Sequence, residues 1–376
     1  MATVAMVIQR YLPHIGGAER QLQQLSPRLK NLGFDVVILT RHEKGLSRFE
    51  VIDGIPVHRL PAAGSKARAA ATFTLSAVLK LIRLRPDIVH AHEILTPASI
   101  AVLTKQIIRR PVLVKVLRGG ARGDVYKLKR RPFWKSNFRS LVRNVDAFIT
   151  ISQEIDEELS ALAVPQEKRF SLPNGVDAVR CIPVSEEQKQ KLRAELSLPQ
   201  QATVVVYAGR LVPEKRVDHL LKVWEAIRSR FFDAHLVIVG EGAQETELKE
   251  MRIDGVQFTG QVDDAVAYLQ AADLFVLPSS TEGLSNSMLE AMSCGLPVLA
   301  TSVGGAPDVI RHQESGYLIP PDDLGSLQRG LEILLEDKAL RFTLGSNARQ
   351  RILSEFSLDS VARRLAGLYR SLLSER

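Results

Sequence analysis

Short apolar runs alternate with amphipathic helical patterns along this chain, and that alternation constrains the fold more than any other feature. In the first half the apolar runs have the length of buried strands, at residues 4–8, 35–39, 88–91, 111–117 and 147–151. Helical patterns separate them, and the one over residues 18–32 ends at Gly33, the residue type favoured just past a helix. Strands that alternate with helices pair in parallel, so the sequence predicts an α/β fold.

The alternation stops at a turn-rich segment, residues 173–177, and then starts again. The second series of apolar runs covers residues 203–208, 234–239, 256–259, 274–277 and 297–300. A chain of 376 residues also exceeds what one hydrophobic core commonly supports. We therefore predict two Rossmann-like, doubly wound domains facing a central cleft, residues 1–175 and 176–352. Residues 353–376 carry an amphipathic helix that we expect to pack back across the seam between them.

The composition excludes several classes of protein. Apolar residues make up 45% of the chain and charged residues 24%, as in globular enzymes and unlike disordered chains. The N-terminus lacks a signal-peptide pattern and no apolar stretch is long enough to cross a bilayer, so we expect a cytoplasmic location. Only Cys181 and Cys294 are present, without a zinc-binding spacing, and no Asp-x-Asp triplet occurs. Neither a disulfide framework nor a metal ion is expected.

Positive charge is concentrated in the first domain. Residues 1–175 hold 28 Lys and Arg against 14 Asp and Glu, whereas the remainder holds 22 against 28. Nine of the cations lie in residues 118–143, where the only acid is Asp124 and aromatic side chains are interleaved. Such a segment is typical of a solvated basic helix or of a surface that lies on an anionic bilayer, here the inner face of the plasma membrane. No nucleic-acid-binding motif accompanies it, so nucleic acid is not an expected partner.

The loop after the apolar run at residues 274–277 has the character of an anion site. Its polar, glycine-containing sequence leads to Ser285 and Asn286, either of which can cap a helix. Free N–H groups at a helix N-terminus suit a diphosphate. Glu282 lies in this loop and Glu290 about one turn into the helix, where they suit a sugar hydroxyl and a ribose. Taken singly, each glutamate is also explained as an ordinary surface residue.

A second polar group follows the apolar run at residues 203–208. Gly209 and Arg210 stand where that strand ends, and Lys215 lies in the loop that follows. A guanidinium and an ammonium at the carboxyl end of a parallel strand can neutralise charge that builds on a departing diphosphate. Outside such a site the same cations would be surface residues without a role.

Two positions in the first domain are further candidates. Gly16 and Gly17 come where the first helix begins, and they allow phosphates or an acceptor to approach the backbone, although a simple tight turn explains them equally well. The glycine spacing of dinucleotide sites is absent. His90 and His92 alternate along one strand, so their imidazoles should lie on the same face. Both fit buried structural histidines, and His92 also fits a group that orients substrate.

With these motifs in view, the chain resembles the GT-B glycosyltransferases of family 4, a retaining group. The resemblance covers nearly the whole chain and rests on its motifs taken together: Gly16-Gly17, PNGVD at 173–177, Gly209-Arg210 with Glu214-Lys215, Gly240-Glu241-Gly242, Glu282 followed by Glu290, and VGG at 303–305. It implies a nucleotide-diphosphate sugar held by the second domain and an acceptor held by the first. It also implies catalysis without a metal ion or any other cofactor.

The resemblance assigns roles to particular residues. Arg210 and Lys215 would bind the diphosphate, Glu282 the donor sugar and Glu290 the ribose. The catalytic set would thus be Arg210, Lys215 and Glu282. The remaining donor contacts would come from Gly16, Gly17, Gly209, Gln261, Val262, Leu284 and Asn286, of which Gln261 and Val262 would border the base.

Two positions depart from the pattern of the family. Many members have a histidine where this chain has Arg118, so Arg118 is, with His92, a candidate for orienting the acceptor or substrate, but a histidine role does not transfer to it. Asp308 stands where many members have Glu after the glycine pair. Both departures bear on specificity more than on fold.

The function expected from the sequence is transfer of a hexose, from a UDP-sugar, to a glycan or lipid-linked acceptor in polysaccharide or glycolipid biosynthesis. One alternative is a nucleotide-sugar 2-epimerase of the same fold, which needs no acceptor. Another is a non-catalytic scaffold that senses nucleotide sugars. The presence of Arg210, Lys215, Glu282 and Glu290 together argues against a scaffold, and acceptor-dependent turnover separates the three.

Overall fold

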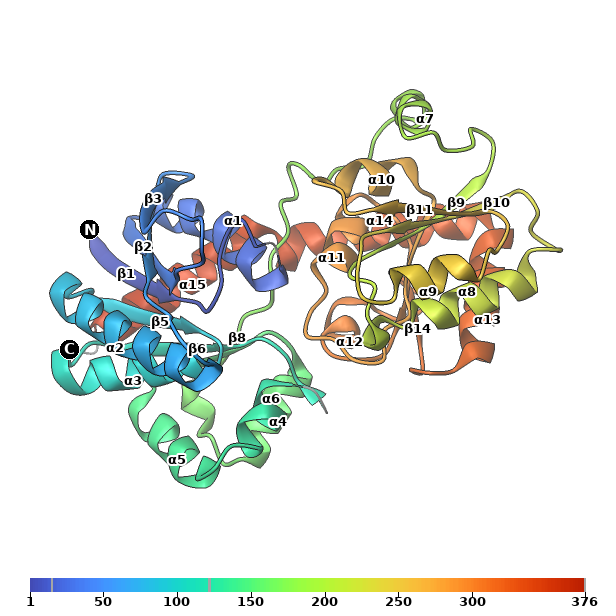
Figure 1. Ribbon diagram of the computed structural model, residues 1–376. Helices are drawn as coiled ribbons and strands as arrows, with labels where there is room; N and C mark the ends of the chain where they lie inside the picture. Colours follow the sequence, from blue (N-terminus) through green and yellow to red (C-terminus); the bar gives the residue numbers. More distant parts are fainter. Residues whose placement is uncertain (15, 121–122, 375–376) are drawn as a thin grey trace. The chain divides into compact units, whose positions relative to one another are not determined.

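The computed structural model describes residues 1–14, 16–120 and 123–374, and the chain divides into two compact units (Figure 1). The first unit contains Met1–Asn174 and the chain from Leu358 onward, and the second contains Gly175–Ser357. Each unit is built around one sheet of mostly parallel strands. The α/β fold with two doubly wound sheets that the sequence predicts is therefore confirmed.

Within the described residues, the first unit has an eight-stranded sheet in the order β3-β4-β2-β1-β5-β6-β7-β8. The strands are β1 (Ala2–Val7), β2 (Phe34–Arg41), β3 (Phe49–Ile52), β4 (Ile55–Leu60), β5 (Ile88–His92), β6 (Val112–Val116), β7 (Ala147–Thr150) and β8 (Arg169–Ser171). The helices are α1 (Gly17–Asn31), α2 (Lys66–Leu84), α3 (Thr96–Ile108), α4 (Asp124–Lys129), α5 (Trp134–Asn144), α6 (Gln153–Ala161) and α15 (Leu358–Ser374), with a 3₁₀ turn at Gln166–Lys168.

The hairpin of β3 and β4 is the one antiparallel pair among the described strands, and our strand prediction missed it. The signal is present, because Asp53-Gly54 joins the two strands and both residues have positive φ angles. An Asp-Gly pair between strand-like runs is a strong hairpin signal, since both central residues of such a turn need φ above zero. The runs on either side are short and half exposed, which hides them from a search for apolar segments.

The core of the first unit lies between one face of its sheet and the helices α1 and α15. Side chains from β1, β2 and β4 to β7 meet Leu22, Leu25 and Leu29 of α1 and Val361, Leu365 and Tyr369 of α15. The C-terminal helix thus completes the core of the first unit, although the second unit separates it from the rest of that unit in sequence. The C-terminal segment that we expected at residues 353–376 begins, as a helix, at Leu358.

The second unit has, among the described residues, a six-stranded sheet in the order β11-β10-β9-β12-β13-β14, in which every pair is parallel. The strands are β9 (Thr203–Ala208), β10 (Ala234–Val239), β11 (Val256–Gly260), β12 (Leu274–Leu277), β13 (Val298–Thr301) and β14 (Tyr317–Ile319). The helices are α7 (Glu186–Glu195), α8 (Val217–Ile227), α9 (Glu245–Glu250), α10 (Val266–Ala271), α11 (Asn286–Ser293), α12 (Ala306–Val309), α13 (Leu324–Glu336) and α14 (Lys338–Arg351). A 3₁₀ turn lies at Pro213–Lys215 and a π-helical turn at Ile352–Phe356.

No helix in the described part of the chain is both long and apolar enough to cross a bilayer.

We predict that the contacts of Tyr369 contribute strongly to holding α15 on the first unit. Its side chain is fully buried, packs edge-on against Phe34 at 5.4 Å, and its hydroxyl lies 2.7 Å from Nδ1 of His90. Tyr369→Ala should lower the free energy of unfolding of the first unit by about 3–5 kcal/mol. Tyr369→Phe should lower it by about 1–2 kcal/mol, because it leaves a buried histidine nitrogen without that partner.

Urea unfolding followed by circular dichroism measures both effects. The matched control is Tyr126→Phe, which removes a hydroxyl from a tyrosine that is about two fifths exposed. If Tyr369→Phe is no more destabilising than Tyr126→Phe, the hydrogen bond to His90 does not hold the helix.

Candidate functional site

Each sheet reverses its strand order at one point. In the second unit the chain runs outward from β9 to β10 and β11, whereas β12 returns to the other side of β9. In the first unit the corresponding pair is β1 and β5. The loops diverge at such a switch point and leave a crevice at the carboxyl ends of the strands, where open α/β sheets bind ligands.

A buried ion pair joins the two loops at the switch point of the second unit. Lys215, in the 3₁₀ turn after β9, contacts Oε1 of Glu282, in the loop after β12. Ser279 donates to the same carboxylate oxygen at 2.8 Å. The side chains of Lys215 and Glu282 are 12% and 8% exposed, so both charges are largely removed from water and each depends on the other.

The backbone ties the same two loops together. The N–H of Ser280 donates to the carbonyl oxygen of Glu214 at 2.9 Å, and the Ser280 hydroxyl donates to it at 3.2 Å. Thr301, at the end of β13, donates its hydroxyl to the Ser279 carbonyl at 2.5 Å. The position of Glu282 is therefore fixed from three strands.

Two glycines let neighbouring loops approach this region closely. Gly240 follows β10 with a φ of +127°, and a Cβ atom there would collide with the carbonyl oxygen of Gly209. Gly304 follows β13 with a φ of +57°, and its Cβ would lie 2.5 Å from the carbonyl oxygen of Gly283. A side chain at either position would be strained both by the backbone conformation and by the contact. Gly240 and Gly304, from two of the glycine motifs singled out in the sequence, thus let the loops after β10 and β13 pack closely on the loops after β9 and β12.

Helix α11 begins at this site. Ser285 caps it by accepting from the N–H of Met288 at 3.3 Å, and the helix starts at Asn286. Glu290 lies further along the helix and is buried at 5% exposure, as is Leu284 at 6%. The first-turn N–H groups therefore lie in the chain directly beyond Glu282, at the positive end of the helix.

The other predicted donor residues of the second unit occupy the same end of the sheet or its border. Arg210 directly follows Gly209 at the end of β9, and its side chain is 64% exposed and lies 3.9 Å from Glu214. Tyr207 is buried beneath it and donates to the Arg210 carbonyl at 3.0 Å. Burial, and then the charge of Glu282, raise the pKa of Tyr207 well above its usual range. Gln261 and Val262 follow β11, two strands away from β9.

The remaining predicted residues belong to the first unit. Gly16 caps α1 with an extended backbone, and Gly17 is its first residue. Arg118 lies in the loop after β6, where its carbonyl accepts from the N–H of Asp124 at 2.9 Å. His92 is buried at 4% exposure, and its ring stacks on that of His90 at 4.3 Å, which confirms that both imidazoles lie on one face of the sheet.

A buried lysine accompanies the two histidines. Lys115 pairs in register with His92 on the neighbouring strand, is 3% exposed, and donates to Oδ1 of Asn174 at 3.1 Å. Burial lowers the pKa of Lys115 to about 8 and that of His90 to about 3. Burial also lowers the pKa of His92 well below its usual value. Both imidazoles are consequently neutral at physiological pH.

Sequence reasoning missed Glu93, which follows β5 at the switch point of the first unit. Gln9, which follows β1, donates to its carboxylate at 2.5 Å, so this bond spans the switch point. Glu93 has a φ of +117°, an uncommon conformation for a side chain other than glycine. Burial raises its pKa to about 7, with smaller contributions from Asp124 and Glu19. A carboxylate directly after the buried strand His90-Ala91-His92 was the signal that could have identified it.

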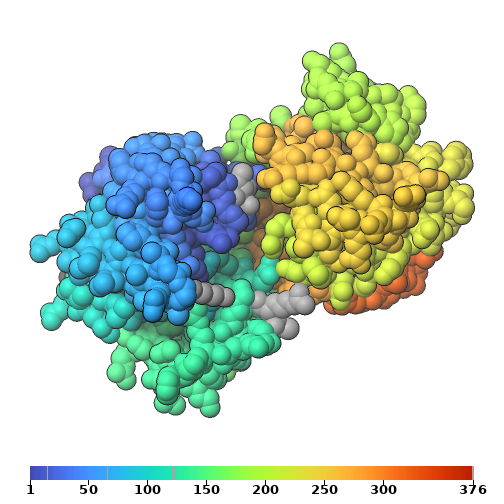
Figure 2. Space-filling view, viewed as in Figure 1, coloured from blue at the N-terminus to red at the C-terminus, as the bar shows by residue number. Residues whose placement is uncertain are grey.

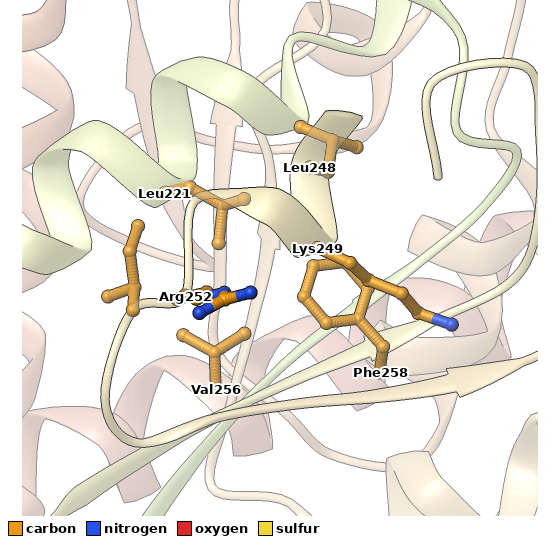
Figure 3. A pocket seen from close by; sticks show the side chains of 7 residues that line it. Leu221, Leu248, Lys249, Arg252, Val256 and Phe258 are labelled. Carbon is orange, nitrogen blue, oxygen red and sulfur yellow. The ribbon is translucent and has the colours of Figure 1, made fainter. Parts of the chain in front are cut away.

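A shallow recess elsewhere on the second unit is a separate feature (Figure 3). It lies among α8, α9 and β11 and is lined by Leu221, Leu248, Lys249, Arg252, Ile253, Val256 and Phe258. Its volume is about 100 Å³. Ligand pockets commonly have roughly 300–1,000 Å³, so the recess does not accommodate a nucleotide sugar. Among the described residues, no group of three or more His, Cys, Asp or Glu side chains is placed to hold a metal ion.

Comparison with known proteins covers both units. The family described as "Glycosyl transferase 4-like domain" matches residues 16–175, and "Glycosyl transferases group 1" matches residues 188–351. The glycogen synthase of Mycobacterium tuberculosis is 29% identical over 97% of this chain and 94% of its own length. The GDP-mannose-dependent monoacylated alpha-(1-6)-phosphatidylinositol monomannoside mannosyltransferase of Corynebacterium glutamicum is 31% identical over 64% of this chain and 66% of its own.

A solved structure shares the fold. Anabaena HepE, in complex with UDP-glucose, is 21% identical and superimposes with a TM-score of 0.81 over 99% of this chain and 100% of its own.

We predict that Glu93 makes stability depend on pH between about 4.5 and about 7. Because its pKa is raised in the folded state, the native protein binds a proton in this window that the unfolded chain releases. With respect to Glu93, the folded state is most stable below the pKa of the unfolded chain, and this stability is lost as the pH rises through about 7. One pKa unit is worth about 1.4 kcal/mol, so Glu93 should cost up to about 3 kcal/mol above that pH.

Urea unfolding of wild type and Glu93→Gln near pH 5 and near pH 8 measures the effect. The variant keeps the side-chain shape but does not titrate, so it should gain stability relative to wild type on going to the higher pH. An equal difference at the two pH values would show that Glu93 ionises normally.

Proposed function

Because the chain belongs to the GT-B glycosyltransferases of family 4 type, we propose that it transfers a hexose from a UDP-sugar to a glycan or lipid-linked acceptor, with retention and without a metal ion. The observation that carries the proposal is the buried Lys215–Glu282 pair at the switch point of the second unit, beside the N-terminus of α11. A cation, a carboxylate and the positive end of a helix in one place match the diphosphate and the sugar hydroxyls of such a donor.

In this proposal the second unit binds the donor. Lys215 and the exposed Arg210 neutralise the diphosphate, which also takes the first-turn amides of α11 near Leu284 and Asn286. Glu282 accepts a hydrogen bond from a sugar hydroxyl, and Glu290 accepts one from the ribose. Gln261 and Val262 border the base.

The two cations also serve the chemical step. The bond from the anomeric carbon to the diphosphate oxygen breaks, and the acceptor oxygen bonds to the same face of that carbon. The acceptor proton passes to the departing phosphate oxygen. Negative charge grows on the diphosphate as its bond breaks, so donors placed there stabilise the transition state more than the ground state. Arg210 and Lys215 supply the charge that a metal ion supplies in other transferases.

The first unit binds the acceptor in this proposal. Gly16 and Gly17 lie where α1 begins after β1, Arg118 lies in the loop after β6, and Glu93 follows β5, all beyond carboxyl ends of parallel strands. His92 is buried beneath them and acts by packing. The basic segment at residues 118–143 meets an anionic bilayer, which suits a lipid-linked acceptor.

We expect UDP to bind the protein without added metal and Lys215→Ala to weaken that binding by roughly ten- to a hundredfold, as loss of a charge-assisted contact does. Calorimetric titration with UDP, GDP and ADP measures it. Lys222→Ala, which removes an exposed lysine on α8, is the matched control. Because loss of Lys215 leaves Glu282 buried without its cation, Arg210→Ala provides a second variant at an exposed position. Binding of none of the three nucleotides would reject the donor site.

We expect sugar transfer to require an acceptor and to continue in excess EDTA. Proton NMR of the product should show the same anomeric configuration as in the donor. Turnover of the nucleotide sugar to an isomer without any acceptor would instead establish an epimerase. Tight nucleotide binding with neither reaction, across a panel of glycan and lipid acceptors, would favour a scaffold.

A further inference from the structure

The outer surface of helices α2 and α3 exposes apolar side chains that nothing in the first unit covers. On α2, Leu75 and Leu79 are 63% and 47% exposed, and they lie one helical turn apart. On α3, Leu103 and Ile107 are 44% and 57% exposed with the same spacing. The two helices pack against each other. Four large apolar side chains on neighbouring helices therefore face outward, although both helices already bury an apolar side against the sheet.

The charge around these side chains has one sign. Residues 66–144 contain 18 Lys and Arg against 3 Asp and Glu, and neither α2, α3 nor α5 carries an acid. The three acids are engaged elsewhere. Asp87 accepts from the N–H of Thr3, Glu93 accepts from Gln9, and Asp124 accepts from the N–H of Leu117.

Helix α5 packs beside α3 and adds a row of cations. Lys135, Arg139 and Arg143 are spaced four residues apart and exposed, while Phe138 and Leu141 face inward. On α2, exposed Arg68 and Arg83 flank the leucines. The atoms of this stretch, light blue to green, form one continuous part of the surface of the first unit (Figure 2). Exposed apolar side chains on α2 and α3 are thus accompanied by exposed cations on α2 and α5.

We propose that the outer surface of α2, α3 and α5 binds an anionic lipid bilayer, with Leu75, Leu79, Leu103 and Ile107 entering the acyl boundary and the cations among the head groups. This deepens the membrane part of the proposed function by naming the surface that inserts. Insertion of the apolar side chains gives an attraction to the bilayer that salt does not screen. The cations attract anionic lipid over about 10 Å at moderate salt.

The charge argues for lipid over a second copy of the chain. In a symmetric dimer each surface meets its own copy, so the cations of α2 and α5 would face one another across the contact without an acid to pair with. An anionic bilayer pairs with all of them at once.

Co-sedimentation with vesicles of phosphatidylcholine, alone or mixed with phosphatidylglycerol, tests the proposal. The double variant Leu75→Ser/Leu79→Ser should lower the partition coefficient for the anionic vesicles at least tenfold, because two inserting side chains are lost. Phe342→Ser, which removes an apolar side chain of α14 that is 79% exposed, is the matched control and should bind as wild type does. The exchanged leucines are exposed, so the variant should fold and keep wild-type nucleotide affinity.

A second pair of measurements separates insertion from charge attraction. Lys135→Gln/Arg139→Gln/Arg143→Gln, on the exposed side of α5, should weaken binding at low salt and change it little at high salt, whereas the leucine variant should be weaker at both. A fluorophore on Leu79→Cys should shift to the blue on anionic vesicles.

Equal binding of the leucine variant and wild type, or no blue shift, would overturn the proposal. So would a concentration-dependent dimer in sedimentation that the leucine variant abolishes, because the occupant would then be a second copy. Loss of nucleotide binding in wild type would instead reject the donor site and leave this surface unaffected.

Discussion

The contact between Lys215 and Glu282 organises the loops at the carboxyl ends of β9 and β12 in the second unit. Taking either charge out of water alone costs several kcal/mol, so the loop after β9 and the loop after β12 are stable in these positions only together. The bonds of Ser280 to the Glu214 carbonyl and of Ser279 to the carboxylate then leave little freedom in either loop. As a result, an ammonium group is held next to the start of α11 before any ligand arrives. A site whose charges are already in place does not have to reorganise when charge develops on a ligand.

The first unit meets a comparable constraint with a different set of buried polar groups. Its buried polar side chains lie where the chain leaves the unit and returns to it. Lys115 donates to Asn174, the last residue before the second unit begins, and His90 pairs with Tyr369 of the returning helix. Since an unpaired buried polar group is costly, these contacts fix both crossing segments to β5 and β6. The chemistry of the strands therefore anchors the two connections between the units.

The sequence predicted the strands best where burial is complete. The bounds of β9, β10 and β12 agree with the predicted runs because β-branched and other apolar residues make up nearly all of these central strands. The hairpin at Asp53-Gly54 and the switch-point carboxylate Glu93 were missed because neither lies in an apolar run. Lys215 and Glu282 are 67 residues apart, and only the pairing of β12 with β9 brings their loops together. Sequence could name both residues as candidates, but a contact at that separation depends on the order of the strands.

The two helix layers of the first sheet differ in how they meet solvent. Helix α15 buries Val361, Leu365 and Tyr369 and turns exposed Arg363 and Arg364 outward, the usual amphipathic arrangement. Helix α2 buries Phe73, Ala77 and Leu81 but turns Leu75 and Leu79 outward. Both helices cover the same sheet, so the requirements of the core do not explain the difference. Exposed apolar side chains on neighbouring helices, in a stretch whose charge has one sign, are instead typical of a surface that contacts a membrane. The difference between the two helix layers is therefore explained by a contact made on the outer side of α2 and α3.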